Sequence, residues 1–372
     1  MPKAAFIYAD QLSRHLLRSD HPLQPRRLRM THELLDALGA FHQPDALRLD
    51  PRPATVEELL LVHEREYIDA VRSISGGENV YPSARYGFSA AGDNPPFKGM
   101  YEAALLSTGA SMLAADLVAD GRSPNAFNIS GGLHHAMANR ASGFCTFNDP
   151  AIAIAALVAK GMRVAYVDID AHHGDGVQHA FYSTDRVLTI SLHESGKYLF
   201  PGTGDPDELG TGAGRGYSVN VPFLPYTSDA VYLEAFDSVV PPLVSAFAPD
   251  VLVIQLGVDA HYLDPLSHLR LTTSAYQSAV QRLLGLCPRV VAMGGGGYHL
   301  STVARVWAME YGQMLGVEWP DTLPEAFSAQ YGVTELMDAP QAVEPDVESQ
   351  TRAFAARSVA DVRNAIFPLY RL

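Results

Sequence analysis

Carboxylate and imidazole side chains alternate directly after an apolar, strand-like run, within residues 168–175 (DIDAHHGD). In an extended segment, side chains two positions apart lie on the same face, so Asp168, Asp170 and His172 point to one side. Carboxylates held this close repel each other unless a cation compensates them. Asp170 and His172 are therefore candidate metal ligands, and Asp259, at the end of another strand-like run, is the expected third ligand. Three protein ligands leave a coordination position for water, which is typical of a catalytic metal site.

One imidazole and two carboxylates make an oxygen-rich ligand set. Zinc fits this set, but Fe(II), Co(II) and Mn(II) fit it too, because ligand type alone does not discriminate among them. The alternative interpretation is that the acids form turns and the histidines lie at the surface. A cluster that combines several types of ligand residue favours the metal site, although no single histidine in it would favour that interpretation by itself.

A histidine pair, His134 and His135, follows two glycines that permit close approach of the backbone. Adjacent imidazoles suit acid–base catalysis when each ring is held by its own carboxylate. Asp168 and Asp175 are available for this, since neither has to bind the metal. A carboxylate partner fixes the tautomer of a histidine and raises its basicity. Without these acids, two polar loop residues would be an equally good interpretation.

Other candidate residues stand in glycine-rich loops. Tyr298 follows four glycines at residues 294–297, where its hydroxyl could donate a hydrogen bond to a developing oxyanion. Phe144 and Phe200 each lie beside glycine and could wall a narrow apolar slot, although core packing is the commoner use of phenylalanine. The sequence contains no segment with the spacing of a dinucleotide-binding fingerprint. It also lacks a nucleophile elbow, a Walker A motif and a CxxC pair.

These candidate residues follow short, almost continuously apolar runs, which are typical of strands in a parallel sheet covered on both faces. Segments with helical periodicity lie between the runs. The alternation predicts an α/β protein, a three-layer α/β/α domain with a central, mainly parallel sheet. Because such sheets bind ligands outside the carboxyl ends of their strands, we expect the scattered residues to meet at one site. The predicted strands are residues 4–8, 125–129, 164–167, 187–192, 251–256 and 289–293.

The helices that cover this sheet are predicted from apolar residues at helical spacing. Thr55 and Glu58 form a capping-box pattern at the start of the first of them. Glycine and proline make residues 75–96 and 199–217 long irregular loops. No linker divides the chain, so residues 1–372 are expected to form a single domain. The predicted helices are residues 55–74, 98–119, 148–160, 228–247, 272–286 and 301–315.

Composition excludes several classes of protein. The 372 residues carry a formal net charge of −14, which argues against a protein that neutralises nucleic-acid phosphates. A hydrophobic fraction of 47 % is enough for a large core and excludes a disordered chain. Two cysteines exclude a disulfide framework. Uninterrupted apolar runs are too short to span a membrane and no signal peptide is evident, so we expect a cytoplasmic protein.

Longer strings carry a family resemblance. They are SGGLHHA (130–136), ASGFCTFND (141–149), VDIDAHHGDGVQ (167–178), SLHE (191–194), FPGTGD (200–205), QLGVD (255–259) and GGGGY (294–298). Together with HPLQPRRLRMTHELL (21–35), they resemble the histone deacetylase family, which has the arginase/deacetylase fold. The resemblance covers about residues 5–315 and is strongest to the bacterial acetoin-utilisation deacetylases, which are similar to class I histone deacetylases.

This resemblance implies a zinc-dependent lysine deacetylase that acts on acetylated proteins or peptides. The implied metal ligands are Asp170, His172 and Asp259. The implied catalytic residues are His134 with Asp168, His135 with Asp175, and Tyr298 as the group that polarises the carbonyl. The implied substrate-binding residues are Phe144, Gly143 and Phe200 along the tunnel, Asp93 and Leu266 at its rim, and Arg27 near an inner acetate pocket.

The resemblance also implies two potassium sites. One lies beside Asp168, Asp170, His172, Ser191 and Leu192, and the other lies near Phe181, Thr184, Val187 and Tyr217. Two positions depart from the usual pattern of the family, because Leu133 stands where many relatives have tryptophan and His299 follows the catalytic tyrosine. The stretch from Glu318 onward lies outside the motifs and is expected to form short helices that pack over the domain or serve an interface.

Alternative functions remain open within this resemblance. Deacetylation of acetylpolyamines or another small acetamide is the main one, but relatives of that type carry an acidic gatekeeper where this chain has Leu266. A ureohydrolase of the same fold needs more carboxylates, for two metal ions. A metal-dependent binding module without activity would not need the complete set of Tyr298, both histidines and all ligands.

Overall fold

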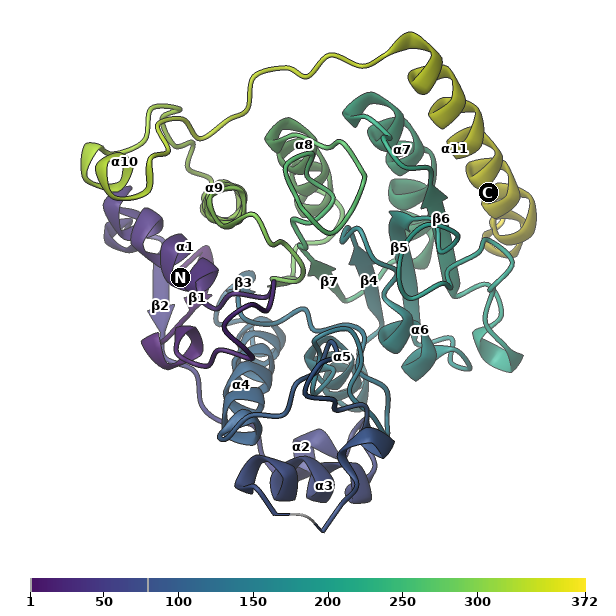
Figure 1. Cartoon of the computed structure of the whole chain (residues 1–372). Helices are drawn as coiled ribbons and strands as arrows, with labels where there is room; N and C mark the ends of the chain where they lie inside the picture. Colours follow the sequence, from purple (N-terminus) through teal and green to yellow (C-terminus); the bar gives the residue numbers. More distant parts are fainter. Residues whose placement is uncertain (1, 79) are drawn as a thin grey trace.

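The central element of the fold is an eight-stranded sheet in which every strand pairs in parallel with its neighbours, in the order β2-β1-β3-β8-β7-β4-β5-β6. The computed structural model describes residues 2–78 and 80–372 (Figure 1). The strands are β1 Ala4–Ile7, β2 Ala46–Leu49, β3 Asn125–Asn128, β4 Val164–Asp168, β5 Val187–Glu194, β6 Ser218–Phe223, β7 Val251–Gln255 and β8 Val290–Met293.

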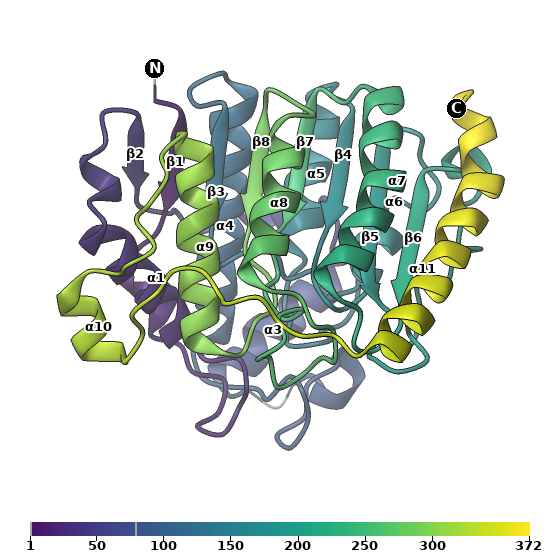
Figure 2. The ribbon, with the colours of Figure 1, turned by 90° about the horizontal axis from the view of Figure 1, so that it is seen from above.

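Helices cover both faces of this sheet (Figures 1 and 2). The helices are α1 Arg26–Ala37, α2 Val56–Leu59, α3 Arg65–Gly76, α4 Met100–Ala119, α5 Asp149–Ala159, α6 Asp175–Phe181, α7 Asp229–Phe247, α8 Thr273–Leu284, α9 Leu300–Leu315, α10 Glu325–Tyr331 and α11 Pro345–Ile366. One hydrophobic core lies between the sheet and α1, α7, α8 and α9, and a second lies between the opposite face and α3, α4 and α5. The predicted three-layer α/β/α architecture is confirmed.

The sequence explains most of these elements directly. The central strands are fully buried and, apart from Asp168 and Gln255 at their carboxyl ends, apolar, as expected for a sheet covered on both faces. The Thr55 capping box is present at the start of α2. Asn148 caps α5 through its side chain, which accepts a hydrogen bond from the N–H of Ala151, and Thr272 caps α8 in the same way through Ser274.

The single helix predicted for residues 55–74 is wrong, because the structure has two helices separated by a turn. In that turn the His63 ring lies between the carbonyl of Met137, 3.0 Å from Nδ1, and the N–H of Asn148, 3.0 Å from Nε2. The N–H of Glu64 donates to the carbonyl of Ala138 at 2.8 Å. The bond from Glu64 diverts a backbone N–H that would have continued the helix, and the ring bonds of His63 hold the turn against this distant loop.

Two strands at the edges of the sheet, β2 and β6, were missing from the sequence-based prediction. Half-buried β2 lacks the continuous apolar character of the central strands. Strand β6 contains Asn220 and Pro222, and proline is tolerated there because an edge strand has a side without a neighbour. The sheet was predicted to be mainly parallel, and among the residues that the structure describes it is entirely parallel.

The C-terminal stretch differs from the short helices that were expected. Helix α10 is short, but α11 has 22 residues and packs on α7 and β6 (Figure 1). The buried face of α11 consists largely of small residues at helical spacing, which gives little hydrophobic signal in the sequence. These buried residues are Thr351, Ala355, Ser358, Val362 and Ile366.

Two helices, α4 and α7, are long and apolar enough to cross a membrane by length and composition alone. In α4, 61 % of the most apolar stretch of the helix is buried inside the protein, and in α7 50 % of the corresponding stretch is buried. Helix α4 packs on α5 and β3, and α7 packs on α8 and α11. Their apolar residues therefore form part of the two cores, as they do in the inner helices of a globular protein.

Candidate active site

The candidate residues meet at the carboxyl ends of four neighbouring strands, β3, β8, β7 and β4. The histidine pair follows β3, Tyr298 follows β8, Asp259 follows β7, and Asp170 with His172 follow β4. Their elements are far apart in the sequence, but parallel pairing aligns the strand ends at one edge of the sheet. The expected convergence of these residues on a single site is confirmed by this geometry.

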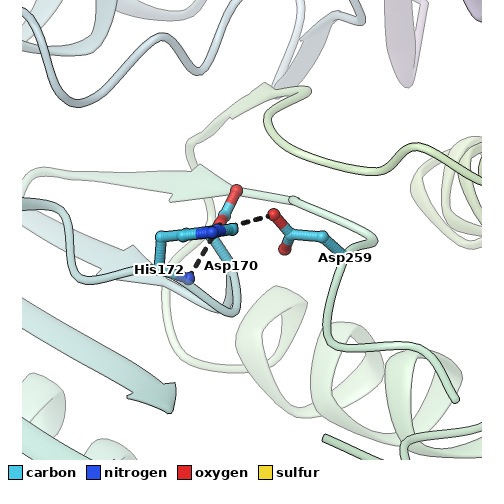
Figure 3. Close-up of side chains that lie close together, drawn as sticks. All are labelled: Asp170, His172 and Asp259. Atoms are coloured by element: carbon cyan, nitrogen blue, oxygen red, sulfur yellow. Dashed lines mark hydrogen bonds and ion pairs between the residues drawn. The ribbon is translucent and has the colours of Figure 1, made fainter. Parts of the chain in front are cut away.

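Asp170, His172 and Asp259 form a buried cluster whose ligand atoms all lie within 4.8 Å of one another (Figure 3). Nδ1 of His172 lies 2.9 Å from Oδ2 of Asp259 and 3.1 Å from Oδ1 of Asp170. Burial and the neighbouring charge of Asp170 raise the pKa of Asp259 to about 6. Two carboxylates so close together in a buried site are stabilised by a cation, and the donor set fits a divalent metal ion.

Backbone groups and one amide fix the orientation of these carboxylates. Oδ2 of Asp170 accepts hydrogen bonds from Nε2 of Gln255 at 2.7 Å and from the N–H of Gly296 at 2.8 Å. Oδ1 of Asp259 accepts one from the N–H of Ala171 at 2.8 Å. A Cβ atom on Gly296 would collide with Asp259, so the glycine run makes room for the ligand carboxylates. Gln255 lay within the string QLGVD, but its side chain received no role in the sequence analysis.

The histidine pair has the predicted carboxylate partners. Nδ1 of His134 lies 2.7 Å from Asp168, and Nδ1 of His135 lies 2.7 Å from Asp175. The two Nε2 atoms face each other at 3.0 Å. Burial lowers the pKa of His134, but the carboxylates of Asp168 and Asp170 outweigh it and raise that pKa to about 9. Burial and the charge of His134 lower the pKa of His135 to about 4.

The loop that carries the histidine pair is held from the start of α5. Asp149 accepts hydrogen bonds from the N–H groups of Gly132 at 3.1 Å and Leu133 at 2.9 Å. Nδ2 of Asn148 donates to the carbonyl of His134 at 3.1 Å. Both residues belong to the string ASGFCTFND, but only the structure shows that they fix the loop. Burial raises the pKa of Asp149 to about 6.

A narrow cavity leads to the cluster and is lined by Leu23, Gly143, Phe144 and Tyr298 together with the histidine pair. The Phe144 ring meets the Tyr298 ring edge-on with a centroid separation of 5.7 Å, and Phe200 meets His135 edge-on at 5.0 Å. Gly143 has a φ of 48°, and a Cβ there would collide with the His135 ring. The two phenylalanines thus stand beside the catalytic candidates, and Phe200, 43 % exposed, lies toward the outside.

Arg27 and Leu266 are two further candidate residues. Arg27 is buried, donates from Nη1 to the carbonyl of Gly297 at 3.0 Å, and lines an adjacent cavity of about 120 Å³ with Leu133 and Phe144. Leu266 is half-buried, and its N–H donates to Asp264 at 3.0 Å. Arg27 thus lines a cavity beside the site, whereas Leu266 lines neither cavity; its place at the rim and the roles of both residues stay predictions.

His21 was missed as a site residue, although it begins the string HPLQPRRLRMTHELL. It is 2 % exposed in spite of lying in a loop. Its Nε2 lies 3.1 Å from the carbonyl of Asp93, and its Nδ1 accepts the N–H of Leu23 at 3.1 Å. The ring also meets Phe144 edge-on at 4.5 Å. His21 therefore joins the loop of Asp93 to the wall of the cavity.

The residues of the expected potassium sites lie on neighbouring segments. Asp168 pairs with Ser191 in the ladder of β4 and β5, and Leu192 follows Ser191. Phe181 ends α6, Thr184 precedes β5, Val187 begins β5, and Tyr217 precedes β6. The N–H of Thr189 donates to the carbonyl of Tyr217 at 2.9 Å, which brings the second group together. Potassium itself stays a prediction.

The end of β5 contributes support rather than ligands. His193 is buried, with Nδ1 2.8 Å from the Ser191 hydroxyl and Nε2 3.0 Å from the carbonyl of Gly204. Glu194 accepts a hydrogen bond from the N–H of His268 at 2.8 Å. His299, one of the two departures from the family pattern, lies 2.7 Å from the Thr302 hydroxyl at the start of α9.

Comparison with known proteins agrees with this geometry. Residues 21–314 match the model of the histone deacetylase domain. The acetoin utilization protein AcuC of Bacillus subtilis is 41 % identical over 332 residues, which is 87 % of this chain and 85 % of that protein. AcuC of Staphylococcus xylosus is 38 % identical over 337 residues, with 88 % and 86 % covered.

Solved structures show the same fold. The crystal structure of a histone deacetylase homologue from Aquifex aeolicus has a TM-score of 0.87 and 31 % identity, covering 96 % of this chain and 99 % of that one. A histone deacetylase homologue complexed with SAHA gives the same TM-score and identity, and 100 % of its chain is covered. The resemblance identified from the sequence strings is thus confirmed, and the chain belongs to the histone deacetylase family, among hydrolases similar to the bacterial AcuC proteins.

Proposed function

We propose that this protein is a metal-dependent amide hydrolase that removes acetyl groups from acetyl-lysine side chains of proteins. The observation that carries the proposal is the narrow cavity beside Phe144, which ends at the Asp170–His172–Asp259 cluster, the histidine pair and Tyr298. A long, thin, apolar chain with an amide at its tip matches such a cavity. Family membership supports deacetylation as the reaction.

Asp170, His172 and Asp259 would hold the metal ion. Zinc is the proposed ion, and Fe(II) or Co(II) also fits the donor set. A divalent ion bound there supplies Lewis acidity, which polarises the amide carbonyl and lowers the pKa of a bound water. Glycine at position 296 leaves room for the two carboxylates, and their bonds to Gln255 and Ala171 hold them in one orientation.

His135 is the proposed general base. Its Nδ1 is occupied by Asp175, so Nε2 is the atom that can take a proton from the attacking water. The lowered pKa, about 4, keeps the ring in its neutral form at neutral pH, so that Nε2 presents a lone pair and not a proton. The same Nε2 then returns the proton to the departing lysine amine. His134, whose pKa is raised by Asp168 and Asp170 against the effect of burial, stabilises negative charge in the site.

Tyr298 is the proposed donor to the carbonyl oxygen. Its backbone N–H is held by Asp264 at 2.7 Å, and its ring is packed against Phe144. The hydroxyl is therefore pre-positioned for the oxyanion of a tetrahedral intermediate. Asp93 would accept hydrogen bonds from the backbone of a bound peptide, and Arg27 would lie beside the pocket that receives acetate.

The choice of a protein substrate depends on Leu266 at the rim, because an acidic side chain there would favour a polyamine with a distal cation. The test is a side-by-side assay of an acetyl-lysine peptide and acetylated polyamines with the metal-loaded protein. We expect kcat/KM to be higher for the peptide. A preference for the polyamine would overturn the substrate class, and no hydrolysis of either amide would overturn the activity. Leu266→Glu is the matched variant, which should shift the ratio toward the polyamine.

A further inference from the structure

A buried carboxylate from the C-terminal part of the chain lies behind the loop that carries Asp259. Oδ2 of Asp338 lies 2.7 Å from Nε2 of His261 and accepts the N–H of Thr273 at 2.9 Å. Oδ1 accepts a hydrogen bond from Nη2 of Arg305 at 2.9 Å. The N–H of Asp338 donates to the Thr273 hydroxyl at 2.8 Å. One residue thereby joins a loop after β7, the start of α8 and the middle of α9.

Asp338 itself is fixed by the segment around it. Nη1 of Arg305 donates to the carbonyl of Leu336 at 3.0 Å, and Asp321 accepts the N–H of Met337 at 2.8 Å. This segment lies outside residues 21–314, which match the family domain, and the chain beyond it runs across α9 and α8 toward α11 (Figure 2). The contact with His261 therefore connects the stretch after the matched domain to the interior.

The contact continues from His261 to two groups of the active site. His261 is fully buried and follows the metal-ligand candidate Asp259 by two residues. Its Nδ1 accepts the N–H of Leu263 at 3.2 Å, and its carbonyl accepts the N–H of Asp264 at 2.8 Å. Asp264 in turn accepts the backbone N–H of Tyr298 at 2.7 Å. A short, fully bonded turn thus links the carboxylate of Asp338 to the backbone of Tyr298.

The charged groups around Asp338 are buried, so the loss of one of them would be costly. Its side chain is 5 % exposed, that of Arg305 is 7 % exposed and that of His261 is fully buried. Removing the negative charge would leave the guanidinium of Arg305 buried without its ionic partner, which is far more costly than losing a surface ion pair. The hydrogen bonds to His261 and to Arg305 also hold the loop against α9.

We propose that Asp338 is a positioning residue of the active site, through which the C-terminal segment holds the Asp259 loop and the backbone of Tyr298 in place. The inference rests on the proposed function as far as turnover is concerned, but its consequence for metal affinity is independent of any substrate. The stretch after the family domain is then part of the framework of the site rather than a mere covering of the helices.

The test compares Asp338→Asn with a control from the same part of the chain, Glu348→Gln. Glu348 lies on α11, where it accepts hydrogen bonds from Ser228 and Arg352, each at 2.7 Å, on elements that do not carry the site. The measurements are the dissociation constant of Zn²⁺ and of Co²⁺ by chelator competition, kcat and KM for an acetyl-lysine peptide and for a small acetamide, and the melting temperature. All binding and rate measurements are made well below the melting temperature of each variant.

We expect Asp338→Asn to weaken metal binding and to lower kcat by about tenfold each, the size seen when partners outside the ligand set are removed. Both substrates should be affected equally, with KM little changed, because the cavity mouth is untouched. Glu348→Gln should leave metal affinity and kcat unchanged. If Asp338→Asn does not fold, Thr273→Val removes only the bond between the Thr273 hydroxyl and the N–H of Asp338 and should shift metal affinity in the same direction.

Two results would overturn the inference. The first is unchanged metal affinity and kcat in the folded Asp338→Asn variant or in its Thr273→Val substitute. The second is an equal loss in Glu348→Gln, which would show a general effect of stability. Should neither substrate be hydrolysed by the unmodified protein, the proposed function fails, while metal affinity still decides the role of Asp338.

Discussion

Replacing Tyr298 with phenylalanine removes one donor from the site and leaves the ring in place. The ring position is set by the bond from its backbone N–H to Asp264 and by edge-on packing against Phe144, neither of which needs the hydroxyl. Burial, together with the charges of Asp259 and Asp170, raises the pKa of Tyr298 well above its ordinary value. The hydroxyl therefore keeps its proton, and can donate it in a hydrogen bond, across the working pH range.

The expected magnitude follows from this geometry. Loss of one donor to an oxyanion in a buried site lowers kcat by about 10²–10³, or ~2.7–4 kcal/mol of transition-state stabilisation. KM, metal content and melting temperature should change little in Tyr298→Phe, since the donor acts mainly on charge that develops in the transition state. The raised pKa also means that the unmodified enzyme should lose no activity at alkaline pH through ionisation of this residue.

The assay is steady-state hydrolysis of an acetyl-lysine peptide by the metal-loaded variant, with metal content determined by elemental analysis and folding followed by thermal denaturation. Near-normal turnover in Tyr298→Phe would refute the proposed role of the hydroxyl. Loss of metal along with activity would show instead that the side chain supports the ligand cluster. Phe144→Leu is a useful companion, because it disturbs the packing of the tyrosine ring but keeps the hydroxyl.

Three further predictions concern other parts of the molecule. Asp259→Ala should release the metal, because it removes one of three ligands, and an unchanged metal content by elemental analysis would contradict this assignment. His21→Phe keeps a ring beside Phe144 but loses the hydrogen bonds to Leu23 and Asp93. KM for a peptide should therefore rise about fivefold, as expected for roughly 1 kcal/mol, while KM for a small acetamide stays the same. Equal effects on both substrates would argue against a role of His21 at the rim. Glu310 is fully buried in α9 with neither carboxylate oxygen bonded within the described residues, and burial raises its pKa well above the ordinary value. The folded protein thus retains a proton that the unfolded chain releases, so the free energy of unfolding is highest below the pKa of Glu310 in the unfolded chain and falls as pH rises toward its pKa in the folded protein. In that pH range the unmodified protein should lose ~1.4 kcal/mol of unfolding free energy per pH unit relative to Glu310→Gln. Parallel pH profiles of the two proteins in denaturant titrations would disprove the ionisation argument.

Central strands and the active-site residues that follow them were predictable because their signals are local. Four buried, apolar runs each end in polar residues, and parallel strands bring their carboxyl ends to one edge. Alternation was used to predict that Asp170 and His172 lie together, and they do, although residues 170–172 form a bend rather than an extended segment. Asp259 was predicted from its place at the end of another strand. The two acids left over, Asp168 and Asp175, were the partners that the histidine pair required.

Elements at the periphery were harder to predict because their burial depends on what packs against them. Edge strand β6 contains Pro222, which is disfavoured in a central strand because it cannot donate a ladder hydrogen bond. Helix α11 buries mainly small residues, so its periodicity carries little hydrophobic contrast. The turn between α2 and α3 is held by bonds from the His63 ring and the Glu64 N–H to a loop more than seventy residues away, which no local pattern contains.

The sequence by itself determined the family and the central strands of the sheet, and it predicted which residues form the candidate ligand cluster, because these follow from apolar runs and from the residue types at the ends of those runs. Tertiary structure decided which distant groups meet around the site: Asp149 under the histidine loop, His21 between Asp93 and Phe144, and Asp338 behind His261. These contacts join loops whose paths depend on the packing of whole helices. A hydrogen bond of this kind leaves no periodicity in the chain, because its two partners meet only after the layers have assembled.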